Sequence, residues 1–238
     1  MSAPVYFISD LHLDDSRPRV TEAFEDFLAQ RRHAAALYIL GDLFETWVGD
    51  DEDSPLIRRV ARALRHFSDS GARLYLMHGN RDFLIGERFA ARTGATLLED
   101  PTVVEEQGQK LLLMHGDSLC THDTEYQAFR AHARSAQWQQ EILALPLAAR
   151  REMAAKLRAM SRDAGSRKAD DIMDVTEKAV VEALSRTDAT ALIHGHTHRP
   201  ARHEDRAGVR WVLGDWEASG WYLTLEDQEF NLKEFNIN

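Results

Sequence analysis

The chain has very little cysteine, no long apolar run and no excess of positive charge. Its 238 residues include one cysteine, Cys120, which excludes an internal disulfide and fits a reducing compartment. No apolar stretch approaches the roughly 20 residues of a membrane-spanning helix. The short run Val5–Ile8 is soon interrupted by Asp10 and His12, unlike the apolar region of a signal peptide. We therefore expect a cytoplasmic protein.

The net charge is −10, which argues against a protein that coats nucleic acid. The charge is unevenly distributed along the chain. Residues 121–168 contain nine Lys or Arg and five Asp or Glu, a net of +4, whereas the rest of the chain carries −14. A basic segment on an acidic body suggests an anionic partner at that place. Charge alone favours the alternative, in which these residues form the solvated faces of helices.

The sequence contains no internal repeat, low-complexity tract or Pro/Gly-rich linker. In the first half, apolar runs typical of buried strands alternate with helical patterns, and residues 202–235 show short alternating β runs. Between them, residues 121–184 are almost entirely helical in composition. We predict one layered α/β core formed by residues 1–121 and 169–238, with a helical cap inserted at 122–168.

The core elements can be placed individually. Helices are predicted at Arg19–Arg32, from Pro55 with Ser54 as its N-cap, and at about Phe83–Arg92 with Asp82 as its N-cap. The acidic run Asp50–Asp53 is interpreted as a solvated loop. The first five strands are predicted at Val5–Ser9, Ala36–Leu40, Ala72–Met77, Lys110–Met114 and Thr190–Ile193.

Polar side chains that can bind metal follow each of these five strands. In chain order they are Asp10 with His12, Asp42, Asn80, His115, and His196 with His198. Ligand sites in open α/β sheets lie beyond the carboxyl ends of the strands, so these five ends can converge on one pocket. Carboxylate, amide and imidazole donors together suit Mn, Fe or Zn, and the absence of thiolate argues against structural zinc. Seven ligands are too many for one ion but suit two ions that share a carboxylate.

Each of these motifs is weak alone, because Asp-x-His and Gly-Asp are common by chance, but their combined order is specific. The order resembles that of the calcineurin-like metallophosphoesterases. The resemblance implies a four-layer α/β/β/α sandwich with two metal ions bridged by Asp42. It implies one ion held by Asp10, His12, Asp42 and His198, and a second held by Asp42, Asn80, His115 and His196.

The motif around Asn80 departs from the common pattern of that family. Many members carry Gly-Asn-His-Asp/Glu, whose His is thought to protonate the leaving group, whereas this chain has Arg81 at that position. Arginine stays protonated at neutral pH and is no general acid, but it can bind a phosphate through two hydrogen bonds. A phosphate leaving group needs no proton. Arg81 therefore favours cleavage of a pyrophosphate over a simple monoester or diester.

Four longer segments narrow the resemblance: Gly41–Asp51, Gly79–Leu84, His115–Asp123 and Ile172–Val175. They are similar to segments of the UDP-2,3-diacylglucosamine pyrophosphohydrolases of lipid A biosynthesis. Members of that family use Mn²⁺ and water to attack the α-phosphorus of UDP-2,3-diacylglucosamine, which gives UMP and 2,3-diacylglucosamine 1-phosphate (lipid X). The resemblance implies this activity and a peripheral association with the cytoplasmic face of the inner membrane. The alternatives are a nucleotide pyrophosphatase, a cyclic-nucleotide phosphodiesterase or a non-catalytic scaffold of the same fold.

The same resemblance implies roles for individual residues. Catalytic roles are implied for Asn80, Arg81 and His196. Gly165 departs from the family, because relatives often have a polar side chain there, so its backbone alone would serve. The implied substrate contacts are Asn80, Arg81, Asp123, Ser161, Gly165, Lys168 and His196.

The cap also shows a pattern of its own. Met153, Leu157 and Met160 fall on one helix face, beside several Lys and Arg residues. An apolar groove with a basic rim suits two acyl chains, a diphosphate and an anionic membrane surface. The pattern alone favours the alternative, a helical hairpin packed on the core with solvated charges. The family resemblance favours the groove.

Overall fold

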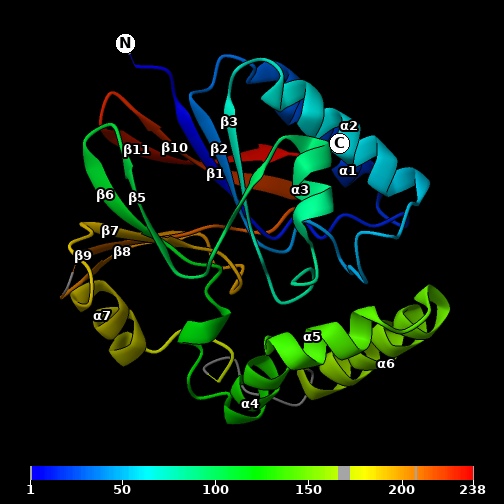
Figure 1. Cartoon of the computed structure of the whole chain (residues 1–238). Helices are drawn as coiled ribbons and strands as arrows, with labels where there is room; N and C mark the ends of the chain where they lie inside the picture. Colours follow the sequence, from blue (N-terminus) through cyan, green and yellow to red (C-terminus); the bar gives the residue numbers. More distant parts are fainter. Residues whose placement is uncertain (1, 166–171, 207, 238) are drawn as a thin grey trace.

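The computed structural model describes residues 2–165, 172–206 and 208–237. Two β-sheets lie face to face with helices outside them, so the predicted α/β/β/α sandwich is confirmed (Figure 1). The first sheet contains, in spatial order, β11 (Glu229–Asn236), β10 (Ser219–Glu226), β1 (Val5–Ile8), β2 (Ala36–Leu40), β3 (Arg73–Met77) and β4 (Thr96–Leu98). The second contains β5 (Thr102–Glu106), β6 (Gln109–Leu113), β7 (Ala191–His194), β9 (Gly208–Val212) and β8 (Ala201–Asp205).

Both sheets are mixed: the first has antiparallel strands at its β11 edge only, and the second has them at both edges. Strands β1, β2, β3 and β4 pair in parallel, as do β6, β7 and β9. Parallel neighbours place their carboxyl ends at one edge of a sheet, so the loops that follow these strands share one end of the sandwich. The short strands β4 and β5 were not predicted. Strand β4 has only three residues, and in β5 exposed residues alternate with less exposed ones, so neither forms a continuous apolar run.

Helices cover both outer faces and one end of the sandwich (Figure 1). Helices α1 (Pro18–Gln30), α2 (Pro55–Ser68) and α3 (Glu87–Thr93) cover the first sheet, and α7 (Glu177–Ser185) covers the second. Helices α4 (Thr124–Ala133), α5 (Ala136–Leu143) and α6 (Leu147–Gly165) lie together at one end. None of the helices in the described part of the chain has the length and apolar character needed to span a bilayer.

Three apolar layers result from side-chain alternation along the strands. In β1, Phe7 faces the second sheet whereas Ile8 faces the helices. In β6, Leu111 and Leu113 enter the layer between the sheets, and Leu112 packs toward α7. Successive residues of a strand point to opposite faces, so strands that are apolar at every position read as buried on both sides.

The helix starts were predicted with mixed success. The Ser54 hydroxyl accepts a hydrogen bond from the Ile57 N–H at 3.1 Å, which confirms the predicted N-cap of α2. The predicted cap at Asp82 is wrong, because α3 begins later, at Glu87. The Asp50 carboxylate accepts from the N–H groups of Gly86 and Phe89, both at 2.9 Å, and so stabilises the start of α3. Asp50 is therefore a structural residue rather than part of a solvated loop.

A buried carboxylate links the two sheets. Glu106 of β5 accepts hydrogen bonds from the Tyr38 hydroxyl of β2 at 2.6 Å and from Arg73 Nη2 of β3 at 2.9 Å. Its side chain is 6% exposed. Burial and the adjacent Glu106 charge raise the pKa of Tyr38, so Tyr38 remains the donor. This contact stabilises the face-to-face packing of the sheets.

We expect Glu106→Gln to lower the free energy of unfolding by about 1–3 kcal/mol. The carboxamide oxygen can still accept a hydrogen bond, but its NH₂ group cannot, so either Tyr38 or Arg73 loses its acceptor. Glu105→Gln is the matched control, since Glu105 is the exposed neighbour in the same strand. It should change stability by less than about 0.5 kcal/mol. Urea unfolding of both variants measures the difference, and equal effects would contradict the role given to Glu106.

Candidate metal centre

Backbone strain is concentrated at the carboxyl ends of the strands. Eight non-glycine residues in the described part of the chain have left-handed φ values, and five of them are predicted metal ligands. Such backbone costs of order 1–3 kcal/mol per residue, and it clusters at functional sites. The other three lie in the turns that join β5 to β6 and β10 to β11. The five ligands, with φ between 49° and 68°, are Asp10, His12, Asp42, His196 and His198.

The first group of predicted ligands converges around Asp10. His198 Nε2 lies 3.3 Å from Asp10 Oδ1, and His12 Nε2 lies 3.9 Å from the same oxygen. The two ring nitrogens are themselves 3.3 Å apart. His12 Nε2 is also 3.7 Å from Asp42 Oδ2. The Asp10, His12 and His198 atoms lie close enough together to bind one cation.

The second group of predicted ligands converges around Asn80 and also approaches Asp42. Asn80 Oδ1 is 2.9 Å from His115 Nε2 and 3.0 Å from His196 Nδ1. His115 Nε2 is 3.8 Å from Asp42 Oδ2. With the Asn80 oxygen in this position three acceptors face one another, and a cation among them would satisfy all three. If the amide is turned, its NH₂ group can donate to the two ring nitrogens where these are unprotonated.

One oxygen of each central carboxylate is anchored and the other is left for the site. Asp10 Oδ2 accepts from the Ser9 hydroxyl at 2.5 Å and from the His196 N–H at 2.9 Å. Asp42 Oδ1 accepts from the Arg81 N–H at 2.8 Å. Asp10 Oδ1 is buried and has no hydrogen-bond partner among the described residues. A buried anionic oxygen without a donor is unfavourable, so the donor set fits a bound cation.

Hydrogen-bond acceptors lie behind three of the histidine rings. His115 Nδ1 donates to the Leu40 carbonyl at 2.9 Å. His12 Nδ1 lies 3.0 Å from Glu45 Oε2, and His198 Nδ1 lies 3.5 Å from Asp215 Oδ2. Such acceptors orient a metal-binding ring and hold its proton on the far nitrogen. We did not predict Glu45 or Asp215 from the sequence, although Asp215, which follows β9, repeats the pattern of a polar residue after a strand.

Asp82 joins two of the ligand loops. Its carboxylate accepts from the N–H groups of Leu43 at 2.7 Å and Gly79 at 2.8 Å, and it is completely buried. Burial and the neighbouring Asp42 raise the pKa of this carboxyl group. The contact holds the loop after β2 against the loop after β3. It therefore fixes the distance between Asp42 and Asn80.

The charges in the centre shift the pKa values of its histidines in opposite directions. Burial lowers the pKa of His115, but the carboxylates of Asp42, Asp117 and Asp10 outweigh burial and raise it to about 9. Burial and the nearby His115 lower the pKa of His196 to about 4. In the metal-free protein, the carboxylates thus draw a proton onto one ring, where a cation would otherwise balance their charge.

Helix α4 contacts the centre through a buried ion-pair network. Asp117 accepts hydrogen bonds from the Tyr126 hydroxyl and from Arg130 Nε, the latter at 2.8 Å. The Tyr126 ring stacks on the His196 ring, with centroids 6.1 Å apart. Arg134 Nη2 donates to the Gly79 carbonyl at 2.9 Å. The network places α4 directly beside the second ligand group.

Helix α6 contacts the loop that follows Asp42. Arg150 Nη1 pairs with Asp51 Oδ1 at 2.7 Å, and Arg151 Nε pairs with Glu52 Oε1 at 2.9 Å. Further along the helix, Arg158 pairs with Glu45. The acidic residues 51 and 52, interpreted from the sequence as solvated, therefore bind the cap to the core.

The predicted substrate contacts fall in two places. Asn80, Arg81 and His196 lie in or directly beside the ligand groups. Asp123 is the N-cap of α4, where it accepts from the Tyr126 N–H at 3.1 Å. Ser161 is exposed on α6, about one turn beyond Arg158, and Gly165 is the last residue of that helix. Lys168 lies outside the described residues.

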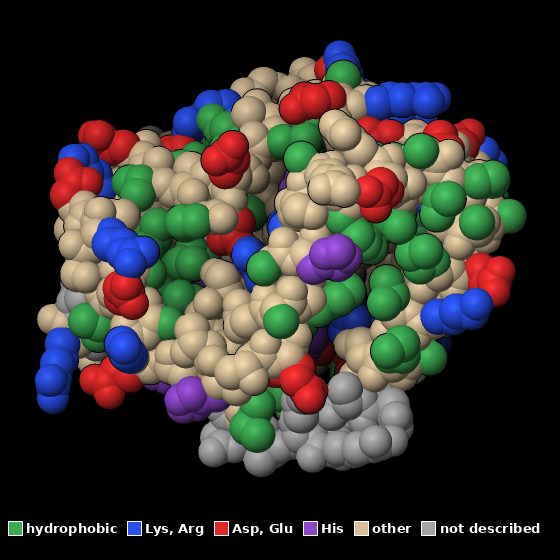
Figure 2. Space-filling model, turned by 60° about the horizontal axis from the view of Figure 1, so that its bottom comes forward, with side chains coloured by type: hydrophobic (Ala, Val, Ile, Leu, Met, Phe, Trp, Pro, Cys, Tyr) green, Lys and Arg blue, Asp and Glu red, His purple; other side chains and the backbone are tan. Residues whose placement is uncertain are grey.

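The cap carries exposed apolar side chains. Figure 2 shows the face on which hydrophobic side chains gather among charged ones near the cap helices. The exposed fractions are 38% for Phe129, 44% for Leu143 and 67% for Met160. The three side chains come from the three cap helices, α4, α5 and α6.

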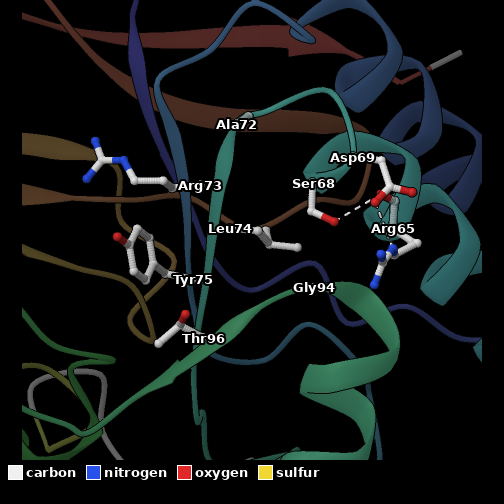
Figure 3. Close-up of a pocket in the computed structure, with 9 residues that line it drawn as sticks. All are labelled: Arg65, Ser68, Asp69, Ala72, Arg73, Leu74, Tyr75, Gly94 and Thr96. Carbon is white, nitrogen blue, oxygen red and sulfur yellow. Dashed lines mark hydrogen bonds and ion pairs between the residues drawn. The ribbon is translucent and has the colours of Figure 1, made fainter.

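A hollow elsewhere on the molecule has no link to this centre. Its volume is about 350 Å³, and it lies between the end of α2 and β3 (Figure 3). Both of its arginines that could attract an anion are already paired, Arg65 with Asp69 at 2.8 Å and Arg73 with Glu106 at 2.9 Å. We assign it no function. It is lined by Arg65, Ser68, Asp69, Ala72, Arg73, Leu74, Tyr75, Gly94 and Thr96.

The close approach of Gly79 to Asp42 generates a test of the centre. A Cβ at residue 79 would lie 2.1 Å from Asp42 Oδ1 and 2.2 Å from the Asp42 nitrogen, so Gly79→Ala must displace the shared carboxylate. We expect Mn²⁺ affinity, measured by calorimetric titration, to fall at least about tenfold.

Gly71→Ala is the control for this substitution. Gly71 has φ +96° and open space around it, so alanine there should cost about 1–2 kcal/mol of stability and leave Mn²⁺ affinity unchanged. Wild-type affinity in Gly79→Ala would contradict the placement of Asp42 in the centre.

Comparisons with known proteins identify the family. The family model for calcineurin-like phosphoesterases matches residues 3–200. A protein of Cellvibrio japonicus named UDP-2,3-diacylglucosamine hydrolase is 51% identical over 97% of this chain and 98% of its own length. Relatives with the same name from Chromohalobacter salexigens and Ectopseudomonas mendocina are 54% and 50% identical, over 92% and 98% of both chains.

Solved structures agree with the fold. A hypothetical protein of Pyrococcus horikoshii OT3 has a TM-score of 0.53 at 10% identity, over 100% of this chain and 88% of its own. An archaeal phosphodiesterase has a TM-score of 0.50 at 14% identity, over 98% and 99% of the two chains. At this identity the likeness shows the fold alone. The sequence match over most of the chain shows more: the chain belongs to the calcineurin-like phosphoesterase family.

Proposed function

We propose that the chain hydrolyses the pyrophosphate bond of UDP-2,3-diacylglucosamine in lipid A biosynthesis. The products would be UMP and 2,3-diacylglucosamine 1-phosphate (lipid X), formed by attack of water on the α-phosphorus. The proposal is supported by relatives that bear this enzyme name and share about half of their residues over nearly their whole length. The observation that carries it is the convergence of all seven predicted ligands, with Arg81 beside them.

The metal ions of this centre are proposed to be two Mn²⁺. When bound, they would lower the pKa of water and balance charge on the attacked phosphoryl group. Asp42 is the residue that both sites would share, because its free oxygen Oδ2 faces both ligand groups. Asp10, His12 and His198 would complete the first site, and Asn80, His115 and His196 the second.

Arg81 gives the centre its preference among phosphate esters. Its backbone N–H holds Asp42, so its position is tied to that of the shared ligand. The guanidinium would bind a substrate phosphate bidentately and balance the charge that grows on the leaving phosphate. It supplies no proton, which a sugar phosphate leaving group does not need and an alkoxide does. This favours a diphosphate substrate over a cyclic nucleotide, which would be the substrate of a phosphodiesterase.

Asn80 and His196 are proposed to contact the same phosphate. Both lie at the second ligand group, beside Arg81, and Tyr126 restrains the His196 ring from the cap side. A non-catalytic scaffold is disfavoured, because all seven ligands are present and left-handed backbone occurs at five of them, at the ends of β1, β2 and β7.

Residues 122–168 are proposed to form the lipid-binding cap. Helices α4 and α6 both contact the centre, and the cap also exposes Phe129, Leu143 and Met160. Apolar side chains close to a phosphate site suit a substrate with acyl chains and a diphosphate. The same surface would bind the cytoplasmic face of the inner membrane, where this substrate resides. Asp123, Ser161, Gly165 and Lys168 are proposed to contact substrate from the cap.

Turnover of UDP-2,3-diacylglucosamine with Mn²⁺, in water enriched in the heavy oxygen isotope, tests the function. We expect the isotope in UMP and none in the lipid phosphate. Arg81→Ala should lower kcat by about a hundred- to a thousandfold, because it removes a stabiliser of transition-state charge, while metal content is kept. Arg92→Ala is the matched control, since Arg92 is a surface arginine paired with Asp53, and its turnover should equal that of the wild type.

Two results would contradict the proposal. Efficient hydrolysis of cyclic AMP without hydrolysis of any nucleotide diphosphate ester would favour a phosphodiesterase. Negligible hydrolysis across diphosphate substrates with Mn²⁺ present would favour a scaffold.

A further inference from the structure

Glu45 connects a candidate metal ligand to the cap. Its Oε2 lies 3.0 Å from His12 Nδ1, and its Oε1 pairs with Arg158 Nη2 of α6. The side chains of Glu45, His12 and Arg158 are 26%, 10% and 15% exposed, so the three groups meet in a largely dry place. Charged contacts of this kind are screened much less than those on an open surface.

The backbone fixes Glu45 at this position. The loop after β1 and the loop after β2 run side by side, joined by four backbone hydrogen bonds, the first from the Asp10 N–H to the Gly41 carbonyl at 3.1 Å. The His12 N–H donates to the Asp42 carbonyl at 2.9 Å, and the Glu45 N–H donates to the Leu13 carbonyl at 3.1 Å. The Leu13 N–H donates to the Leu43 carbonyl at 2.9 Å between them. The backbone therefore holds the His12 ring and the Glu45 carboxylate close to each other.

The carboxylate determines which nitrogen of His12 can bind metal. A neutral imidazole carries one proton, and the other nitrogen offers a lone pair. His12 Nδ1 is buried and has no aligned hydrogen-bond partner among the described residues, and the Glu45 carboxylate, 3.0 Å away, is the acceptor that a small turn of either side chain would bring into line. A proton held on Nδ1 toward Glu45 leaves Nε2 free, and Nε2 is the atom that faces Asp10 and Asp42.

Glu45 differs from the other acidic residues that contact α6. Asp51 and Glu52 also pair with arginines of this helix, but Glu45 alone among these three described carboxylates touches a candidate ligand as well. Arg158 occupies one carboxylate oxygen and thereby turns the other toward His12. The docking of α6 and the orientation of the His12 ring thus depend on the same carboxylate.

We propose that Glu45 is a positioning residue for the metal centre, which holds His12 in its metal-binding tautomer and couples that ring to the cap through Arg158. The proposal rests on the proposed metal centre. Loss of such an acceptor behind a metal-binding histidine typically weakens metal affinity by 10- to 100-fold. A simple ion pair between loop and helix would instead affect stability alone.

The test compares Mn²⁺ affinity in three variants of the full chain by calorimetric titration at one pH. Glu45→Ala should bind Mn²⁺ about 10- to 100-fold more weakly. Glu45→Gln keeps an oxygen that can accept from His12 Nδ1 and should recover most of the affinity. Glu52→Gln is the matched control, because it breaks an ion pair with α6 that touches no candidate ligand, and it should bind as the wild type does.

Wild-type affinity in Glu45→Ala, or an equal loss in Glu52→Gln, would overturn the proposal. A second measurement needs no variant: heteronuclear NMR of the metal-free wild type should place the His12 proton on Nδ1, and a proton on Nε2 would overturn the proposal. Failure of the wild type to bind Mn²⁺ at all would overturn the metal centre itself. Strong wild-type binding with no effect of Glu45→Ala would overturn the role of Glu45 alone.

Discussion

Mutual repulsion among converging acceptors is the constraint on which this site depends. Oxygen and nitrogen lone pairs from five strand ends face one another in a buried space, and one oxygen of Asp10 has no donor among the described residues. Such an arrangement is unfavourable without positive charge. The fold maintains it with left-handed backbone at five ligands, whose cost the large apolar layers of the sandwich offset. Metal binding would relieve the same repulsion.

The shell around the ligands holds them in this arrangement. Backbone N–H groups occupy one oxygen each of Asp10 and Asp42, so only the other oxygen faces the centre. Asp82 ties two ligand loops together, and acceptors behind His12, His115 and His198 orient those rings. Because the cap helices contact this shell through Asp117 and Glu45, movements of the cap and changes in the centre are expected to be coupled.

The strand ends could be predicted because buried parallel strands are continuous apolar runs, and because polar residues after such runs are unusual. The ligand set followed from those ends, and the four-layer order followed from the family pattern. The short strands β4 and β5 gave no such signal. The start of α3 was misplaced because Asp82 has the sequence signature of an N-cap, whereas its carboxylate accepts from loops distant in sequence.

Ion pairs between residues distant in the sequence could not be predicted either. Glu45 and Arg158 are 113 positions apart, and no periodicity relates them. The acidic residues 51 and 52 read as a solvated run because their partners, Arg150 and Arg151, lie about a hundred residues away. Residues that act through tertiary contacts thus became visible only in the folded chain, whereas residues at the ends of strands were visible in the sequence.

The most direct test of the account is a crystal structure of the Mn²⁺-loaded protein with anomalous scattering recorded at the manganese edge. The account predicts two anomalous peaks, one on each side of the Asp42 carboxylate. One should lie among Asp10, His12 and His198, and the other among Asn80, His115 and His196. A single peak, or peaks away from Asp42, would contradict the central claim that the seven side chains form one shared two-metal site.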